Sequence, residues 1–310
     1  MLPILLKTLP FFALIGVGYW AGRSRFFGAE ATAALTRFVF YFALSALLFR
    51  FAAKLSLAEI FDARFAAAYL AGGLAVYALT FAVALARRIG VEQAAMESQC
   101  AVSGNTGFLG LPMLAVLLGP ASVGPMLMVL TIDMAVFASA ITLIMTAARG
   151  GRMRAGAMVR ELAMGLLRNP MIVSMVLGLA WGASGAALPG PVDEFMAMLG
   201  SAATPGALFA IGASLAARSA ERLQVALWLS FAKLVLHPAA VALAALAVFR
   251  VDPYAAGVMI SAAALPVAGN TYMLAAHYGV APQRVSAAIL ISTAVSIVTV
   301  TAVIAWVTAG

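Results

Sequence analysis

The residues most capable of chemistry are three ionisable side chains that lie inside long apolar stretches of the chain. Asp133 occurs within the run Thr-Ile-Asp-Met, and Lys233 and His237 are four positions apart, so a helix places both on one face. An ionisable group inside a membrane-spanning helix costs at least about 2.5 kcal/mol, which makes it a functional candidate. Lys233 is a candidate counter-charge for a bound anion, and Asp133 and His237 are candidates to carry a coupling proton or bind sodium. A structural pair between Lys233 and Asp133 is the alternative.

Two further stretches combine glycine, proline and asparagine in a pattern that breaks helices. Residues 103–112 read SGNTGFLGLP, and residues 264–271 read ALPVAGNT. Each glycine costs up to about 1 kcal/mol relative to alanine and each proline about 3 kcal/mol, and proline also removes a backbone donor. Freed backbone groups persist inside a membrane only where they are packed in protein or line a wet cavity. We therefore predict two unwound segments that frame a binding site, with the alternative that these residues serve close packing or a kink.

The start of a half-helix after each break would present unpaired N–H groups and the positive end of the helix dipole. Such a terminus suits a carboxylate. The two breaks and Lys233 together predict a site for a small organic anion.

Composition shows that these residues are positioned by membrane-spanning helices. The chain has 310 residues, 65% of them hydrophobic and 10% charged, with a mean hydropathy of +1.06. A transmembrane helix needs about 20 mostly apolar residues, and runs of that length recur throughout. We predict an all-α polytopic membrane protein with ten spans, at residues 3–20, 34–53, 66–87, 93–118, 122–147, 167–187, 195–217, 225–249, 254–278 and 283–308.

The ten spans divide into two similar halves. A shift of 165 residues places Gly104-Asn105-Thr106 on Gly269-Asn270-Thr271 and the first five spans on the last five. A unit with five spans enters the membrane from the opposite side the second time, which predicts an inverted repeat of the kind found in secondary transporters. The predicted units are residues 1–150 and 166–310, joined by a short basic cytoplasmic linker at 151–165.

The net charge of +8 reflects topology rather than a nucleic-acid partner, because the basic residues lie at helix ends and form no stripe with interleaved aromatics. With both termini outside, five bases face outward: Lys7, Arg50, Lys54, Arg64 and Arg250. Thirteen face inward: Arg23, Arg25, Arg37, Arg87, Arg88, Arg149, Arg152, Arg154, Arg160, Arg168, Arg218, Arg222 and Arg284. This bias is the positive-inside pattern of a plasma-membrane protein. A single cysteine, Cys100, excludes an intramolecular disulfide framework and a cysteine-based zinc cluster.

The broken fourth span, with Gly-Asn-Thr-Gly and a following proline, resembles the auxin efflux carrier family of plant PIN carriers and bacterial organic-acid permeases, within the superfamily that resembles bile-acid symporters. The similarity extends over the chain, including LTRFVFYFALSALLF at 35–49, Asn169-Pro170, ATPGALFAIGASLA at 203–216 and residues 233–238. The resemblance implies crossing breaks in spans four and nine, a scaffold of spans one, two, six and seven, a mobile transport domain of the other spans, and a homodimer. It also implies that the substrate is framed by these residues: Asn105, Thr106, Gly107, Pro112, Pro266, Gly269, Asn270 and Thr271.

Two departures from the family pattern bear on the substrate. Ser45 stands where the family usually has a proline, so the resemblance does not define the span-two end of the cavity, and the long hydrophilic central loop of plant carriers is missing. Without that loop, the chain resembles the short bacterial members of the family in the inner membrane. This resemblance implies that the substrate is a malonate-type or malate-type dicarboxylate.

Three other functions are compared with this carrier. A sodium-coupled symporter of a larger amphipathic anion would share the architecture and would use Asp133 as an ion ligand. An enzyme is not expected, because no HExxH run, phosphate loop, nucleophile–base pair or cofactor fingerprint occurs. A channel is not expected either, because no repeated selectivity-filter segment is present. No cofactor or metal is predicted.

Overall fold

The computed structural model describes residues 2–54, 62–150, 160, 163–164, 167–217 and 223–309. Most of the predicted linker at 151–165, together with Arg218 and Arg222, lies outside these residues. The described residues form helices and connecting turns, with one isolated β-bridge between Gly104 and Val267. Seven of the described helical segments are long and apolar enough to cross a membrane: Ile4–Arg23, Ala29–Ala52, Ala63–Ala86, Pro120–Ala148, Gly190–Ala216, Leu223–Val248 and Pro282–Ala309.

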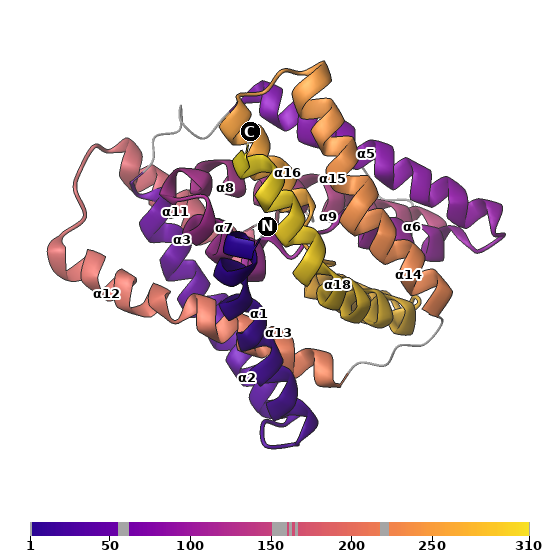
Figure 1. The fold of residues 1–310 in the computed structure, drawn as a ribbon, viewed down its shortest axis with the longest axis horizontal. Coiled ribbons are helices and arrows are strands. Elements are labelled where there is room, and N and C mark those ends of the chain that lie inside the picture. Colours follow the sequence, from indigo (N-terminus) through magenta and orange to yellow (C-terminus); the bar gives the residue numbers. More distant parts are fainter. Residues whose placement is uncertain are drawn as a thin grey trace.

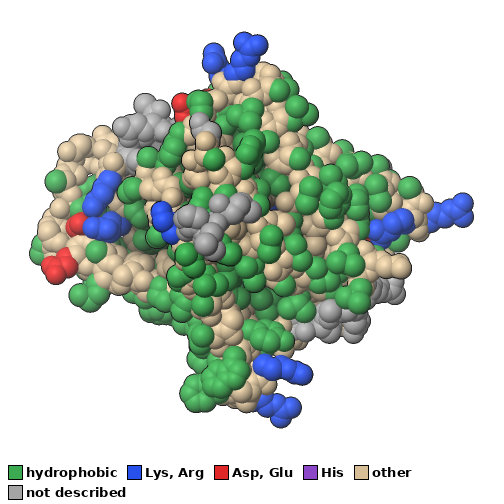
Figure 2. Space-filling view, viewed as in Figure 1, with side chains coloured by type: hydrophobic (Ala, Val, Ile, Leu, Met, Phe, Trp, Pro, Cys, Tyr) green, Lys and Arg blue, Asp and Glu red, His purple; other side chains and the backbone are tan. Residues whose placement is uncertain are grey.

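Three other described apolar helices are shorter and overlap only parts of the other three predicted spans, so the full set of ten spans stays a prediction. They are Thr106–Leu117, Pro170–Ala183 and Pro253–Ala263. Hydrophobic side chains are spread over the whole face shown in Figure 2, and lysines and arginines stand out at its top, right and bottom ends and in its left part. Large apolar residues such as Trp20, Met198 and Val298 are more than half exposed. Water does not solvate an apolar surface of this extent favourably, and the chain is a multi-pass α-helical membrane protein.

The first group of helices lies at the left and bottom of Figure 1. It comprises α1 (Leu2–Arg23), α2 (Ala29–Phe38), α3 (Leu44–Ala52), α11 (Pro170–Ala183), α12 (Gly190–Ser201) and α13 (Ala203–Ala216). Helix α1 packs along α13, and α3 packs against α11 and α12. Gly212 permits the closest approach, because a Cβ atom there would lie 1.9 Å from the carbonyl oxygen of Ile15. Small residues allow such close backbone contacts between membrane helices.

The second group fills the centre and right of Figure 1. It comprises α5 (Ala63–Ala86), α6 (Val91–Val102), α7 (Leu111–Leu117), α8 (Val123–Ile132), α9 (Ala138–Ala148), α14 (Leu223–Phe231), α15 (His237–Ala242), α16 (Pro253–Ala263), α17 (Gly269–Tyr278) and α18 (Pro282–Ala309). Helix α5 packs against α6 and α15, α14 packs against α18, and α16 packs against α8, α15 and α18.

Side-chain caps set the start of three helices. The carboxylates of Asp62 and Asp252 accept hydrogen bonds from backbone N–H groups in the first turns of α5 and α16, and the Asn169 side chain does so for α11. Each cap satisfies donors that have no partner inside the helix.

π-Helical turns of the described residues cover Val39–Ala43 in the first group and Thr106–Gly110, Asp133–Phe137, Ala232–Leu236 and Leu243–Val248 in the second. Three of these five contain a residue singled out by sequence: Thr106, Asp133 or Lys233. π-Helical turns are frequent at functional sites, because they redirect side chains at the cost of regular hydrogen bonding.

Candidate functional site at the crossing of two broken helices

Helices are interrupted within both predicted segments, but over shorter stretches than predicted: residues 103–105 and 264–268 are non-helical, whereas 106–112 and 269–271 are helical. The backbones of the two interruptions pair with each other. Helix α6 ends at Val102 and α16 ends at Ala263, each followed by a few non-helical residues. The Asn105 N–H donates to the carbonyl oxygen of Pro266 at 2.9 Å, and the Ala268 N–H donates to that of Ser103 at 3.0 Å. The two unwound segments therefore cross in antiparallel orientation within the second group of helices.

The crossing satisfies several of the backbone groups that the breaks set free. The N–H groups of Leu109 and Gly110 donate to the carbonyl oxygen of Asn105, and the Val267 N–H donates to the Ser292 hydroxyl at 3.1 Å. Gly110 lies so close to the second break that a Cβ atom there would meet Leu265 at 2.3 Å. Unwound backbone inside a membrane protein requires such partners.

The two half-helix starts at the crossing differ in exposure. Thr106, at the start of the segment that leads into α7, is buried, and Asn105 before it is only 8% exposed. At the start of α17, Gly269 and Asn270 are exposed, and no atom lies within 4 Å of a Cβ atom built on Gly269. Thr271 follows in a buried position, and its hydroxyl has no hydrogen-bond partner among the described residues. The α17 start is thus the more open of the two.

Three other predicted site residues of the two segments lie in the packed interior. Pro112 and Pro266 are buried, and Gly107 is partly buried against Met171 of α11. A Cβ atom on Gly107 would lie 2.7 Å from the Met171 methyl carbon.

Asp133 is hydrogen-bonded directly to the first break. Its Oδ2 atom accepts from the Thr106 hydroxyl at 3.1 Å, and its Oδ1 atom accepts from the Tyr69 hydroxyl on α5 at 2.8 Å. All three side chains are buried. Sequence reasoning missed Tyr69, because a tyrosine in an apolar span is usually a packing residue.

Lys233 is in contact with the second break. Its fully buried ammonium donates to the carbonyl oxygen of Ala263, the last residue of α16, and lies 3.2 Å from Nδ1 of His237. A Cβ atom on Gly104 in the first break would lie 3.3 Å from Nζ of Lys233. A cation at the C-terminal end of a helix is favourable, because carbonyl groups there lack helical partners.

Asp133 and Lys233 form no direct ion pair among the described residues, so the structural pair allowed by the sequence is not seen. His237 is buried, and its Nε2 atom has no partner among the described residues. Its ring centroid lies 5.8 Å from that of Tyr69. These side chains therefore form a buried polar group that reaches from one break to the other.

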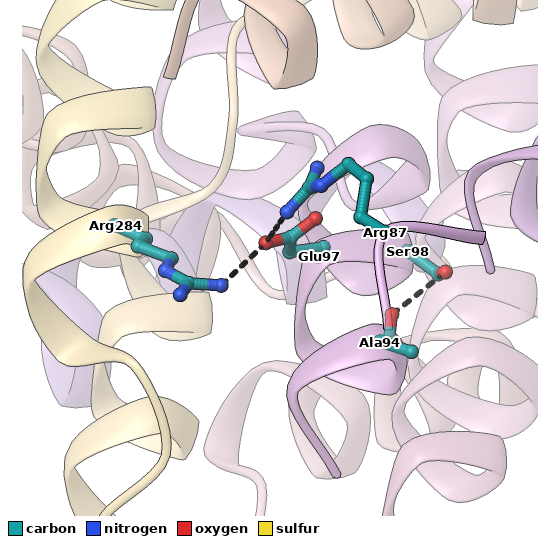
Figure 3. Close-up of polar contacts among 5 residues, drawn as sticks. All are labelled: Arg87, Ala94, Glu97, Ser98 and Arg284. Atoms are coloured by element: carbon teal, nitrogen blue, oxygen red, sulfur yellow. Dashed lines mark hydrogen bonds and ion pairs between the residues drawn. The ribbon is translucent and has the colours of Figure 1, made fainter. Parts of the chain in front are cut away.

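A second carboxylate that the sequence reasoning did not select lies in α6. Figure 3 shows Glu97 between the guanidinium groups of Arg87 and Arg284, both 2.8 Å from its Oε1 atom. Glu97 is 2% exposed. It lies near the start of the predicted fourth span, where a charged residue is expected at the membrane interface, and one of its two partners, Arg284, is distant in the chain.

The outer ends of the broken helices are also tied together. Arg149 after α9 binds the Glu92 carboxylate at 2.6 Å, donates to the carbonyl oxygen of Tyr278 and lies over the Tyr278 ring. This joins the start of α6 to the end of α17. The Tyr254 hydroxyl donates to the carbonyl oxygen of Leu118 at 2.9 Å, which joins the start of α16 to the end of α7. The crossing is thus held at its centre and at all four outer ends.

Comparison with known proteins agrees with this architecture. Residues 3–304 match the family described as "Membrane transport protein". The chain is also 32% identical over 305 residues to a protein of Rhizobium meliloti (strain 1021) named "Putative malonate transporter", and the alignment covers 98% of this chain and 95% of the relative. The motifs at the two breaks, the helical membrane architecture and the family match lead to one assignment. The chain belongs to the membrane transport protein family, which is the auxin efflux carrier family that its broken helices resemble.

Proposed function

We propose that this protein is a secondary active transporter of a small carboxylate, with a dicarboxylate such as malonate or malate as the expected substrate, and that it works by alternating access. The observation that carries the proposal is the crossing of the two breaks through the Asn105–Pro266 and Ser103–Ala268 backbone hydrogen bonds. Substrate sites of many secondary transporters lie where such discontinuous helices meet.

The substrate carboxylate would bind at the open start of α17. Gly269 and Asn270 are exposed there, and Asn105 lies at the edge of the paired segment. The N–H groups and the dipole of a helix start favour an anion, and the buried Lys233 adds a positive charge near the same crossing. The name of the Rhizobium relative supports malonate as the first substrate to test.

The packing pattern supports a ten-span, five-plus-five inverted repeat with units at 1–150 and 166–310. In the predicted span order, α1 against α13 is a contact of span one with span seven, and α11 against α3 is a contact of span six with span two. Helix α5 against α6 joins spans three and four, and α15 against α16 joins spans eight and nine. Adding five to each span number, with span eleven counted as span one, converts the contact of spans one and seven into that of spans six and two. It likewise converts the contact of spans three and four into that of spans eight and nine.

The distribution of polar contacts supports a fixed scaffold of spans one, two, six and seven and a mobile domain of the others. The ion pairs of the described residues each stay within one helix group: Arg50–Asp193, Lys54–Asp193, Arg87–Glu97, Arg149–Glu92 and Arg284–Glu97.

Contacts between the two groups are of a different kind. Phe40 stacks on Phe108 with parallel rings 6.1 Å apart, and the Thr8 and Thr301 hydroxyls share a hydrogen bond of 3.0 Å. Apolar and hydroxyl contacts of this kind can break and re-form as one helix group moves along the other, without separating opposite charges. This property suits an elevator-like motion of one group against the other.

The expected setting is a bacterial inner membrane with both termini outside. Arg87, Arg149 and Arg284 lie together near the start of α6 and α18 and the end of α17, and the positive-inside rule places this end in the cytoplasm. A homodimer is part of the same proposal, since the family resemblance implies it.

Transport by purified protein in proteoliposomes tests the proposal. We expect saturable uptake of one or a few mono- or dicarboxylates, measured with and without imposed proton or sodium gradients. The double variant Asn105→Ala plus Asn270→Ala should abolish uptake, whereas Asn169→Ser, which keeps a capping side chain at α11, should transport normally.

The same assay separates the alternative carrier. Uptake of a large amphipathic anion with strict sodium dependence, and no uptake of small carboxylates, would assign a sodium-coupled symporter of the bile-acid type instead. Uptake of no anion by folded protein would contradict both.

A further inference from the structure

We propose that Asp133 takes up one proton together with the carboxylate substrate, and that the Thr106 hydroxyl transmits this protonation to the backbone of the helix crossing. The inference rests on the proposed carboxylate transport and names its coupling ion. It also gives a role to Tyr69, as the residue that holds Asp133 in position.

The Thr106 hydroxyl has two acceptors within reach and only one hydrogen atom to donate. Its Oγ1 atom lies 3.1 Å from Oδ2 of Asp133 and 3.3 Å from the carbonyl oxygen of Gly104. Gly104 is the residue of the first break that forms the β-bridge with Val267 of the second. The direction of one hydroxyl bond therefore connects Asp133 to the paired backbone.

The protonation state of Asp133 selects between these two acceptors. An ionised carboxylate only accepts hydrogen bonds, so Thr106 donates to Oδ2 while Tyr69 donates to Oδ1. When a hydronium ion gives a proton to Oδ2 and leaves as water, the new O–H group donates to Oγ1 of Thr106, and the Thr106 hydroxyl rotates to donate to the Gly104 carbonyl. One O–H bond forms on Asp133, and the Thr106 O–H bond stays intact. Tyr69 keeps its bond to Oδ1 throughout.

The charges around Asp133 explain why the proton would accompany an anion. The ionisable groups near Asp133 are Tyr69 on α5 and Lys233 and His237 in the 223–248 segment. One carboxylate and one ammonium cancel, so a dicarboxylate bound at the α17 start adds two negative charges beside this buried polar group. Unbalanced charge next to buried ionised side chains is costly, and a proton on Asp133 offsets one of the two charges.

The same geometry favours a proton over a metal cation at Asp133. Cations such as calcium or magnesium are held by several oxygen lone pairs, whereas Tyr69 and Thr106 turn hydroxyl hydrogens toward the two carboxylate oxygens. In the described part of the chain, no group of three or more His, Cys, Asp or Glu side chains is placed to hold a metal ion.

The first test measures proton uptake when malonate is added to purified protein in weakly buffered detergent with a pH indicator dye. The wild type and Thr106→Ser should take up one proton per malonate bound, and their affinity should fall by up to about tenfold per pH unit as pH rises. Asp133→Asn should bind malonate without proton uptake and without this pH dependence. Thr106→Val should still fold and take up a proton with malonate, because the charges around Asp133 are unchanged, and its broken link to Gly104 is tested by the second readout.

A second readout needs no substrate. The infrared band of a protonated carboxylic acid should appear as the pH of the substrate-free protein is lowered, should be missing in Asp133→Asn, and should change position in Thr106→Val but not in Thr106→Ser. Malonate binding without proton uptake would overturn the inference and leave the proposed transport intact. A titrating, Thr106-dependent Asp133 band without binding of any carboxylate would instead contradict the proposed substrate. An unchanged band in Thr106→Val would overturn the link through the hydroxyl.

Discussion

Replacing Glu97 with glutamine removes the negative charge that holds α5, α6 and α18 together beside the crossing. The Glu97 carboxylate is 2% exposed, and the side chains of Arg284 and Arg87 are 13% and 32% exposed. Removing one member of a buried ion pair costs about 3–5 kcal/mol, mainly because the remaining charge stays buried. Partial solvation of the two arginines lowers this cost, and the neutral amide of glutamine still accepts a hydrogen bond. We therefore expect Glu97→Gln to lower the free energy of unfolding by about 2–3 kcal/mol.

Glu92→Gln is the matched control, because Glu92 and its partner Arg149 are both about a third exposed or more. An exposed pair of this kind contributes about 0–1 kcal/mol. Thermal unfolding in detergent should therefore show a clearly lower midpoint for Glu97→Gln than for Glu92→Gln. Transport by Glu97→Gln at a temperature where it is folded should also be slower, because α6 carries the first break. Equal midpoints for the two variants would refute the assignment of Glu97 as the charge that fixes α6 in place.

Two further substitutions test the packing and the crossing. Gly212→Ala should destabilise the protein by about 1–3 kcal/mol, because its methyl group would overlap the carbonyl oxygen of Ile15. Gly16→Ala is the control: it has open space around it and should leave the unfolding midpoint unchanged. Lys233→Met should lower the unfolding midpoint by an amount equivalent to about 1–3 kcal/mol, because the buried carbonyl oxygen of Ala263 loses its donor. Malonate uptake by this variant should also fall. Normal uptake would contradict the role of the ammonium group in anion binding.

The two helix breaks could be predicted from sequence because glycine and proline act on their own backbone. The glycine- and proline-rich runs at 103–112 and 264–271 disfavour a continuous helix whatever surrounds them, and the structure interrupts both spans within these runs, at residues 103–105 and 264–268. Pro112 itself lies in the first turn of α7 rather than in the interruption. The pairing of Asn105 with Pro266 could not be derived from either run alone, because it depends on how two distant spans pack. The resemblance to a family with crossing helices supplied that expectation.

The polar partners at the site were harder to predict, because burial and partnership are properties of the packed structure. Asp133 and Lys233 stood out as charges in apolar runs, but the tyrosine that binds Asp133 has no such signature in span three. Glu97 was missed because it lies only a few residues inside its span, where a charge is ordinary. Its two arginines come from positions 87 and 284, and only the fold places them on one oxygen atom.

Accessibility of the α17 start to a membrane-impermeant thiol reagent tests the alternating-access site most directly. A single-cysteine protein would carry Asn270→Cys on a Cys100→Ala background, since Cys100 is the chain's one native cysteine and is buried. In sealed vesicles of known orientation, we predict labelling at position 270 from either side. Labelling from one side only would contradict an alternating-access site at the crossing.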